Sequence, residues 1–191
     1  MGRLTLILGG ARSGKSTHAQ RLAGQHGGRV VYLATATAGD AEMKSRIEKH
    51  QQDRPAAWMT REIPVGIADA LANQPVQADV VILDCLTLLV SNVMLNGVTD
   101  FDHPDESAAA ERVETEISSL LSTIQTSPVY WIIVSNEVGL GLVPPYPLGR
   151  IYRDLLGRAN QQLAACADEV YWLVAGIPVP IHPFREVEET G

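Results

Sequence analysis

The sequence contains only two cysteines in 191 residues, Cys85 and Cys166. Neither lies at the short spacing from another cysteine or histidine that a zinc site or a redox-active Cys-x-x-Cys pair requires, so the sequence argues against both kinds of site. Isolated cysteines are typical of small core residues in a reducing cytosol, and we expect both side chains to be buried.

Long apolar runs and an excess of positive charge are also missing. No run is long enough to span a membrane, and the apolar stretch near the N-terminus is too short for a signal peptide. The chain has 15 Lys and Arg residues against 22 Asp and Glu, and its net charge of -7 supplies no broad attraction for nucleic acid. We therefore expect a cytoplasmic protein with no membrane span and no nucleic-acid partner.

The composition is instead that of a globular domain. Hydrophobic residues make up 46% of the 191 residues, which is enough for a sizeable core. We find no internal repeat, low-complexity segment or linker in the sequence. These features predict one domain that covers residues 1–191.

One short stretch carries most of the functional information. It matches G-x-x-x-x-G-K-[ST], the phosphate-binding loop of nucleoside triphosphate enzymes. Its residues are Gly9, Gly10, Ala11, Arg12, Ser13, Gly14, Lys15 and Ser16. Glycines let backbone N–H groups converge on a phosphate, the Lys15 ammonium can bind the β- and γ-phosphates, and the Ser16 hydroxyl can hold Mg²⁺. We predict that this loop, with Thr17 after it, binds a nucleoside triphosphate.

The sequence on either side of the loop supports this interpretation. Residues 4–8 form a short apolar run typical of a buried parallel strand, and residues 17–23 carry apolar side chains at helical spacing. Strand, loop and helix thus follow in the required order, and the positive end of the helix adds attraction for an anion. A glycine-rich turn with an incidental lysine is the weaker alternative.

Strands and helices alternate along the rest of the chain. We expect strands at residues 4–8, 29–35, 80–84, 129–135 and 169–174, with an extended or short strand segment at 58–64. We expect helices at residues 17–23, 67–72, 86–95, about 108–124 and 151–167, and one that follows the capping box of residues 37–40 and runs to about residue 53. Loops are expected at 96–106 and 136–150, and a tail at 178–191. This alternation predicts an α/β fold with a mostly parallel sheet flanked by helices.

Ligands of open parallel sheets bind at the carboxyl ends of the strands. This rule gathers Thr35, Asp84, Asn136 and Glu137 at the same edge as the loop. A carboxylate at the end of a buried strand can reach Mg²⁺ directly or through water, so we expect Asp84 to complete a metal site with Ser16. Asp84 could instead cap the following helix, and Glu137 could be a base, a group near the metal or a turn residue.

The loop and several later motifs together closely resemble the bifunctional adenosylcobinamide kinase/adenosylcobinamide-phosphate guanylyltransferase family. The resemblance extends from about residue 4 to residue 176, and the order and spacing of the motifs are specific although each later motif alone is weak. The motifs read Gly9-Gly10-x-Arg12-Ser13-Gly14-Lys15-Ser16, Asp40-x-Glu42-Met43-x-x-Arg46-Ile47-x-x-His50-x-x-x-Arg54-Pro55-x-x-Trp58-x-Thr60-x-Glu62-x-Pro64, Asn136-Glu137-Val138-Gly139, Val143-Pro144-x-x-x-Leu148-x-Arg150 and Arg153-Asp154-x-x-Gly157-x-x-Asn160-Gln161.

This resemblance implies two reactions of cobalamin synthesis. In the first, ATP or GTP phosphorylates the aminopropanol hydroxyl of adenosylcobinamide. In the second, GMP from GTP is transferred to that phosphate, which gives adenosylcobinamide-GDP and pyrophosphate. The family resemblance further implies a single-domain P-loop NTPase of RecA-like arrangement, and a homotrimer.

The resemblance also implies a catalytic histidine. In this family a histidine attacks the α-phosphate and carries GMP covalently, and the matching position is His50. Arg46 and Arg54 stand four residues to either side. Two guanidiniums would keep the imidazole neutral and could stabilise charge on the α-phosphate. An ordinary basic helix face is the alternative for these residues. Thr35 and Glu62 are further expected nucleotide-binding residues.

Two other functions remain possible on the sequence. A P-loop kinase for another small hydroxyl substrate would keep the loop but leave His50 structural. A regulatory GTPase or nucleotide-dependent binding module would need a guanine-reading motif, and the sequence has no obvious N-K-x-D. We expect the bifunctional enzyme, with adenosylcobinamide, its phosphate, GTP, ATP and Mg²⁺ as ligands.

Overall fold

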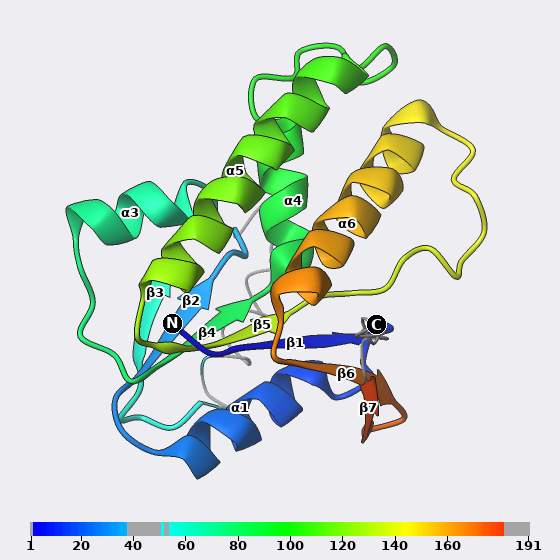
Figure 1. Ribbon diagram of the computed structural model, residues 1–191. Coiled ribbons are helices and arrows are strands. Elements are labelled where there is room, and N and C mark those ends of the chain that lie inside the picture. The colour runs from blue at the N-terminus through cyan, green and yellow to red at the C-terminus, as the bar shows by residue number, and fades with distance from the viewer. Residues whose placement is uncertain (1, 38–50, 52–53, 182–191) are drawn as a thin grey trace, which may run out of the picture.

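The computed structural model describes residues 2–37, 51 and 54–181, and a seven-stranded sheet runs through them (Figure 1). The strands are β1 (Leu4–Gly9), β2 (Val30–Ala34), β3 (Met59–Glu62), β4 (Val80–Asp84), β5 (Tyr130–Val134), β6 (Glu169–Val174) and β7 (Ile177–Ile181). They lie in the order β3-β2-β4-β5-β1-β6-β7. Strands β1 to β6 pair in parallel, and β7 runs antiparallel to β6.

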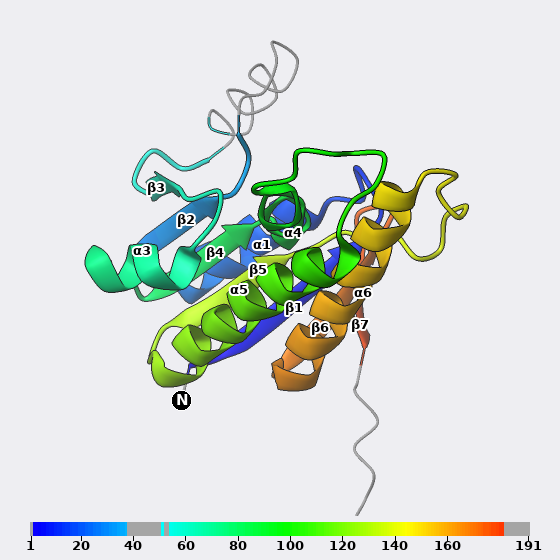
Figure 2. The same ribbon diagram turned by 90° about the horizontal axis from the view of Figure 1, so that it is seen from above.

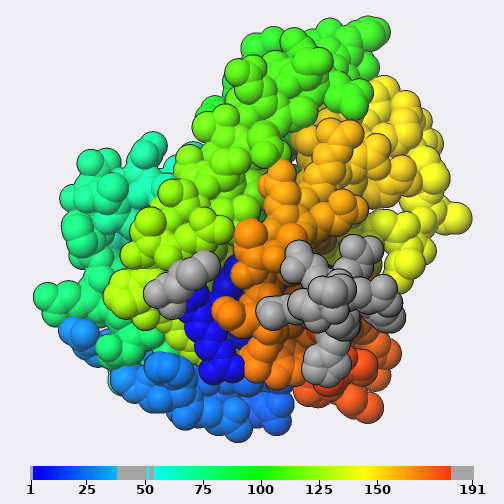
Figure 3. All heavy atoms as spheres, viewed as in Figure 1, coloured from blue at the N-terminus to red at the C-terminus, as the bar shows by residue number. Residues whose placement is uncertain are grey.

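Helices cover both faces of this sheet, as parallel strands with crossover connections require. They are α1 (Lys15–His26), α3 (Ile67–Asn73), α4 (Leu86–Leu95), α5 (Glu106–Thr126) and α6 (Pro147–Cys166). Of the helices in the described residues, α1 lies on one face and the other four lie on the opposite face (Figures 1 and 2). The space-filling view in Figure 3 shows α5 and α6 side by side on that face, where Gln162 Nε2 donates to the Glu114 carboxylate.

The core has two parts, one on each face of the sheet. Alternate residues of β1 point to opposite sides: Leu4 and Leu6 pack with α4, α5 and α6, whereas Ile7 packs with Ala19 and Ala23 of α1. Burial on both faces explains why the central strands are almost continuously apolar. Each fully buried leucine or isoleucine contributes about 1.5–3 kcal/mol to folding relative to exposure.

The expected α/β fold with a mostly parallel, helix-flanked sheet is confirmed. One strand, β5, lies between the strand of the phosphate loop, β1, and the strand that ends in Asp84, β4. The predicted strands at 4–8, 29–35, 80–84, 129–135 and 169–174 each match an observed strand to within about a residue at either end. Apart from Gln51, the helix expected through about residue 53 lies outside the described residues.

The prediction of a tail from residue 178 is wrong over its first part. Residues 177–181 form β7, which turns back on β6 through Ala175 and Gly176 with φ of 50° and 82°. Two prolines made this stretch look irregular. A strand at the sheet edge tolerates them because the missing N–H need not pair with a neighbour, and Pro178 and Pro180 oppose Leu173 and Tyr171 here.

Helix α6 begins earlier than predicted. It starts at Pro147 instead of residue 151, so the preceding loop is shorter than expected. Proline suits the first turn of a helix because the N–H that it lacks would have no intrahelical acceptor there. Helix α5 also starts slightly early, at Glu106, because the Asp105 side chain accepts a hydrogen bond from Ala108 N at 3.0 Å.

The cysteine prediction is half wrong. Cys85 is mostly buried, but Cys166, the last residue of α6, is exposed. Its position on the last turn of an amphipathic helix, beyond the buried Leu163, places it outside the core. In the part of the chain that the structure describes, no helix has both the length and the apolar character needed to cross a membrane.

Candidate functional site

The carboxyl ends of the parallel strands form the edge where the sequence predicted the site. The residues after β1 form the phosphate loop, and Asp84 ends β4 two strands away, which corresponds to about 10 Å across the sheet. The segments that follow the strands are joined directly: Glu137 N donates to Gly9 O at 3.2 Å and Thr35 N donates to Asp84 O at 3.2 Å. The predicted gathering of these residues at one edge is therefore observed.

The loop adopts a backbone conformation that only some residues accept. Gly14 has φ of 95° and Arg12 has φ of 56°, both in the left-handed region. Ser13 N donates to Gly10 O at 3.3 Å, and His18 N donates to Gly14 O at 2.9 Å at the start of α1. The loop thus ends at the N-terminus of a helix, where backbone N–H groups and the helix dipole attract an anion.

Replacement of Gly9 by alanine is expected to lower the free energy of unfolding by about 1–3 kcal/mol. A Cβ atom there would lie 2.6 Å from Leu173 O and 2.8 Å from Ser13 Oγ, so β6 and the loop would have to separate. Gly10→Ala is the control, because its Cβ would meet nothing within 4 Å. Urea unfolding without nucleotide measures both variants. A loss as large in Gly10→Ala, or none in Gly9→Ala, would contradict this packing.

Lys15 is held inside the loop. Its side chain is only 7% exposed, and its Nζ donates to Gly10 O at 2.6 Å. Burial lowers the pKa of Lys15 from its ordinary value, and the neighbouring Cys85 and Asp84 partly offset this shift. The ammonium therefore points into the space that the loop encloses, and one backbone carbonyl is its hydrogen-bond acceptor among the described residues.

The other predicted loop residues surround Lys15. Ser13 Oγ is buried and has no hydrogen-bond partner among the described residues, although its backbone oxygen accepts from Gly176 N at 2.9 Å. Ser16 is partly buried, whereas Ala11, Arg12 and Thr17 are exposed. Buried polar groups usually have a hydrogen-bond partner, so a phosphate bound in this loop could supply the partner that the Ser13 hydroxyl lacks.

Asp84 is in place for a metal role. Its carboxylate is half-buried and accepts a hydrogen bond from the Tyr32 hydroxyl. Among the described residues, no group of three or more His, Cys, Asp or Glu side chains could hold a metal ion alone. Mg²⁺ usually keeps waters and phosphate ligands beside one or two protein oxygens, so a site of Asp84 and Ser16 is of the right kind.

Thr35 holds the backbone next to Asp84. Its side chain is fully buried, its hydroxyl donates to Cys85 O at 2.7 Å, and the same oxygen accepts from Cys85 N at 2.9 Å. Asn92 Nδ2 donates to Thr35 O at 2.8 Å. Burial, with the charge of Asp84, raises the pKa of the Cys85 thiol to about 11. Thr35 therefore positions the strand end, and its predicted contact with a nucleotide stays a prediction.

The residues expected to carry out guanylyl transfer are only partly described. His50 and Arg46 lie outside the described residues. Arg54 lies in a bend, and its guanidinium carbon sits 3.6 Å from the centre of the Tyr32 ring. Glu62 ends β3 and pairs with Ala34 of β2, so it lies at the same sheet edge. It is exposed, and its carboxylate accepts a hydrogen bond from Gln51 Nε2 at 3.2 Å. Its nucleotide contact also stays a prediction.

Three residues to which the sequence assigns no definite role have local contacts. The Glu137 carboxylate accepts from Gly139 N, which supports the turn interpretation among those considered. Arg150 donates to the carbonyls of Pro144 and Pro145 at 3.1 and 3.0 Å and so braces the loop before α6. Arg153 pairs with its neighbour Asp154 at 3.2 Å.

Sequence reasoning missed Tyr32 and His18. Tyr32 was read only as a strand residue, although a tyrosine two positions before the end of a buried strand can place its hydroxyl at the site edge. His18 lies one turn after Lys15, is 7% exposed and contacts Arg21 NH2 through Nδ1 at 3.0 Å. Its Nε2 is buried without a partner among the described residues, and its ring meets the edge of Tyr171.

Burial of His18 makes the stability of the protein depend on pH. Burial, and secondarily the Arg21 charge, lowers the pKa of His18 below its ordinary value of 6.5. The unfolded chain therefore binds this proton first as the pH falls. The contribution of neutral, buried His18 to folding stability is fully present above about pH 6.5, and it is lost as the pH falls from there through the pKa of His18 in the folded protein.

Urea unfolding between pH 7.5 and 5.5 measures this dependence. His18→Gln is expected to flatten the fall in unfolding free energy, whereas His26→Gln, on the exposed end of the same helix, should leave it as in the unaltered protein. Equal slopes for His18→Gln and the unaltered protein would contradict the assignment.

Comparison with known proteins covers nearly the whole chain. A family model described as cobinamide kinase / cobinamide phosphate guanyltransferase matches residues 5–181. The bifunctional adenosylcobalamin biosynthesis protein CobU of Escherichia coli (strain K12) is 42% identical over 180 residues, which cover 93% of this chain and 99% of that protein. CobP of Pseudomonas aeruginosa, with the same description, is 43% identical over 176 residues, which cover 92% and 95%.

A solved structure is similar at lower identity. The crystal structure of the RadB recombinase aligns with 90% of this chain and 74% of its own, at 15% sequence identity and a TM-score of 0.47.

Proposed function

Because the chain belongs to the cobinamide kinase / cobinamide phosphate guanyltransferase family, we propose that it catalyses two successive reactions of adenosylcobalamin synthesis. First, the aminopropanol hydroxyl of adenosylcobinamide attacks the γ-phosphorus of ATP or GTP, and the nucleoside diphosphate leaves. Second, GMP is transferred from GTP to the new phosphate, which releases pyrophosphate and forms adenosylcobinamide-GDP.

The observation that carries this proposal is the preformed phosphate loop beside Asp84. The loop presents N–H donors, the α1 terminus and the buried Lys15 ammonium at one sheet edge, in a chain that matches the family over residues 5–181. The Lys15 ammonium can bind the phosphate that is transferred in the first reaction and the pyrophosphate that leaves in the second. One phosphate cradle thus serves both.

Mg²⁺ fits the residues at this edge. The Ser16 hydroxyl and the Asp84 carboxylate would hold it with phosphate oxygens and water, and it would neutralise charge on the phosphates. Asp84 offers a carboxylate oxygen that is not taken by Tyr32, and Lys15 lies on the loop side. The chain's own task is to keep these groups fixed before the nucleotide arrives.

We assign GMP transfer to His50, on the strength of its position in the family motif. A neutral imidazole nitrogen attacks the α-phosphorus of GTP, and the bond to pyrophosphate breaks. An oxygen of the corrinoid phosphate then attacks the same phosphorus, the phosphorus–nitrogen bond breaks, and the imidazole is free again. Arg46 and Arg54 are proposed to stabilise the negative charge on the α-phosphate.

We further propose a homo-oligomer, with three subunits by family resemblance. Exposed apolar side chains on β7 support association: Ile177, Val179 and Ile181 are 65%, 46% and 40% exposed. A cytoplasmic location stays a prediction.

Product analysis tests the proposed function. The purified protein is incubated with adenosylcobinamide, GTP and Mg²⁺, and the corrinoids are resolved by mass spectrometry. We expect adenosylcobinamide phosphate followed by adenosylcobinamide-GDP, with pyrophosphate in equal amount to the latter. If only adenosylcobinamide phosphate is formed, the protein is a simple P-loop kinase. GTP turnover with the corrinoid unchanged would contradict both functions.

A further inference from the structure

A tyrosine that the proposed mechanism does not use lies against the Asp84 carboxylate. Tyr32 is 1% exposed, and its hydroxyl donates a hydrogen bond to Asp84 Oδ2. Ala34 pairs with Asp84 in the sheet, and Tyr32 lies two residues before Ala34, so both side chains project from the same face. The phenol therefore reaches the carboxylate diagonally across two adjacent strands.

This hydrogen bond constrains the carboxylate. Because a carboxylate oxygen can only accept, the Tyr32 hydroxyl is the donor of this hydrogen bond. Among the described residues, the Asp84 side chain accepts this hydrogen bond alone. One carboxylate oxygen is thus fixed by the protein, and the other remains for a ligand at the sheet edge.

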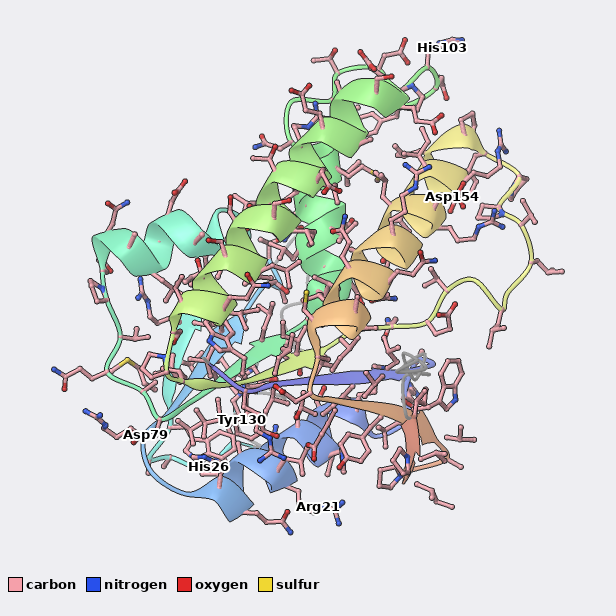
Figure 4. The ribbon with its side chains drawn as sticks, in the orientation of Figure 1. Arg21, His26, Asp79, His103, Tyr130 and Asp154 are labelled. Carbon is pink, nitrogen blue, oxygen red and sulfur yellow. The ribbon has the colours of Figure 1, made fainter. Side chains whose placement is uncertain are left out.

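Packing does not require this pairing. Tyr130 is a comparable residue, because it is 7% exposed and belongs to the same core face as Tyr32. Its hydroxyl is 2.8 Å from Thr5 Oγ1, a neutral partner. Figure 4 shows Tyr130 near His26 and Asp79, at the strand starts and away from the phosphate loop. A buried tyrosine of this core can therefore be satisfied without a carboxylate.

Arg54 packs against the tyrosine of this pair. Its guanidinium lies on the face of the Tyr32 ring, 3.6 Å from the centre, a favourable arrangement for a cation. Its NH1 donates to Thr60 Oγ1 at 3.3 Å, whereas its Nε is buried and has no acceptor among the described residues. Arg54 follows His50 by four residues. The contact thus links Arg54 to Tyr32 and, through the Tyr32 hydroxyl, to Asp84.

We propose that Tyr32 is a positioning residue that fixes the Asp84 carboxylate for a divalent cation, and that Arg54, through its contact with the Tyr32 ring, holds the phenol in place. The inference rests on the proposed metal role of Asp84. Groups that hold a metal ligand in place from behind typically change metal affinity about 10- to 100-fold when they are removed. Tyr32 is expected to act in this way.

The test is the Mg²⁺ dependence of nucleotide binding in Tyr32→Phe, with Tyr130→Phe as the matched control. Both variants remove one buried hydroxyl and keep the ring, so both should fold. Binding of a non-hydrolysable GTP analogue is titrated with Mg²⁺, and its affinity is also measured in excess chelator. We expect Tyr32→Phe to need about 10- to 100-fold more Mg²⁺ for half-maximal effect, with the metal-free affinity unchanged. Tyr130→Phe should match the unaltered protein.

The role of Arg54 is tested by a double-mutant cycle. Arg54→Ala should raise the Mg²⁺ requirement in the unaltered background but have no further effect on it in Tyr32→Phe, since the hydroxyl through which it acts is gone. The contact of Arg54 with the α-phosphate proposed above would be detected separately, as an equal loss of metal-free affinity in both backgrounds. Additive effects on the Mg²⁺ requirement would overturn the coupling.

The outcomes separate this inference from the proposed function. If the unaltered protein binds the analogue in an Mg²⁺-dependent manner and Tyr32→Phe has the same Mg²⁺ requirement, the positioning role is wrong while the proposed function stands. The same holds if Tyr130→Phe shifts as much as Tyr32→Phe. If the unaltered protein does not bind the GTP analogue at all, the proposed function itself fails.

Discussion

Replacement of Lys15 by methionine is expected to slow both proposed reactions by about 10²- to 10³-fold, the usual loss when one charged group that stabilises the transition state is removed. The Lys15 side chain is buried in the loop and bonded to Gly10 O, so its ammonium is held where phosphates would bind. Initial rates of corrinoid phosphorylation and of GMP transfer, each with its own purified substrate, measure the two losses separately.

The same variant should fold at least as well as the unaltered protein. A buried ammonium loses hydration, as the lowered pKa of Lys15 reflects, and methionine fills similar space without a charge. We therefore expect an unfolding free energy that is unchanged or higher, measured by urea unfolding. A variant that loses activity because it unfolds would contradict this explanation.

Arg29→Met is the control for the loss of one positive charge. Arg29 precedes β2, at the opposite edge of the sheet, and forms an exposed ion pair with Asp79 at 3.4 Å. Exposed ion pairs contribute little to folding stability, so the variant should fold normally. Because Arg29 is far from the phosphate loop, both activities should remain near those of the unaltered protein. If Lys15→Met abolished only one of the two reactions, the proposal that they share one phosphate cradle would be wrong.

Replacement of His50 by alanine is expected to separate the two activities. GMP transfer should fall by at least about 10³-fold, because the covalent route is lost, whereas phosphorylation of adenosylcobinamide should stay within a few fold, since the phosphate loop is untouched. The measurement is the ratio of adenosylcobinamide phosphate to adenosylcobinamide-GDP formed with GTP. We expect the phosphate to accumulate.

His103→Ala is the matched control for this change. The His103 side chain is 86% exposed and lies in the loop before α5, where its Nδ1 is 3.3 Å from Asp100 Oδ2; Figure 4 shows it near the start of that helix. It should leave the product ratio unchanged. Retained GMP transfer in His50→Ala would support the alternative in which His50 is structural and the protein is a P-loop kinase.

Strong local patterns made much of the fold predictable. The phosphate loop combines fixed glycines, a lysine and a serine between a strand and a helix, and the structure places these elements as expected. The apolar strands were predictable because burial on both faces leaves little room for polar residues. Their carboxyl ends gathered Thr35, Asp84 and Glu137 at one edge, as the rule for parallel sheets requires.

What could not be predicted depends on contacts between distant segments. Tyr32 gains its role from Asp84, which is 52 residues away in the chain, and no local spacing encodes that hydrogen bond. The start of α6 at Pro147 and the edge strand β7 were missed because proline was read as a breaker where its missing N–H has no cost. Cys166 is exposed because it is the last residue of α6 and lies beyond Leu163, the last buried residue of that helix. Which residue ends a helix and which face is covered depend on packing with other elements.

The most direct test of the account is covalent labelling with GTP that carries its label on the α-phosphate. The protein and its His50→Ala variant are incubated with this nucleotide and Mg²⁺, then denatured. We expect an acid-labile, alkali-stable adduct in the unaltered protein and none in His50→Ala. No adduct in the unaltered protein despite demonstrated GTP binding, or an adduct that persists in His50→Ala, would contradict a guanylyl-histidine intermediate at His50.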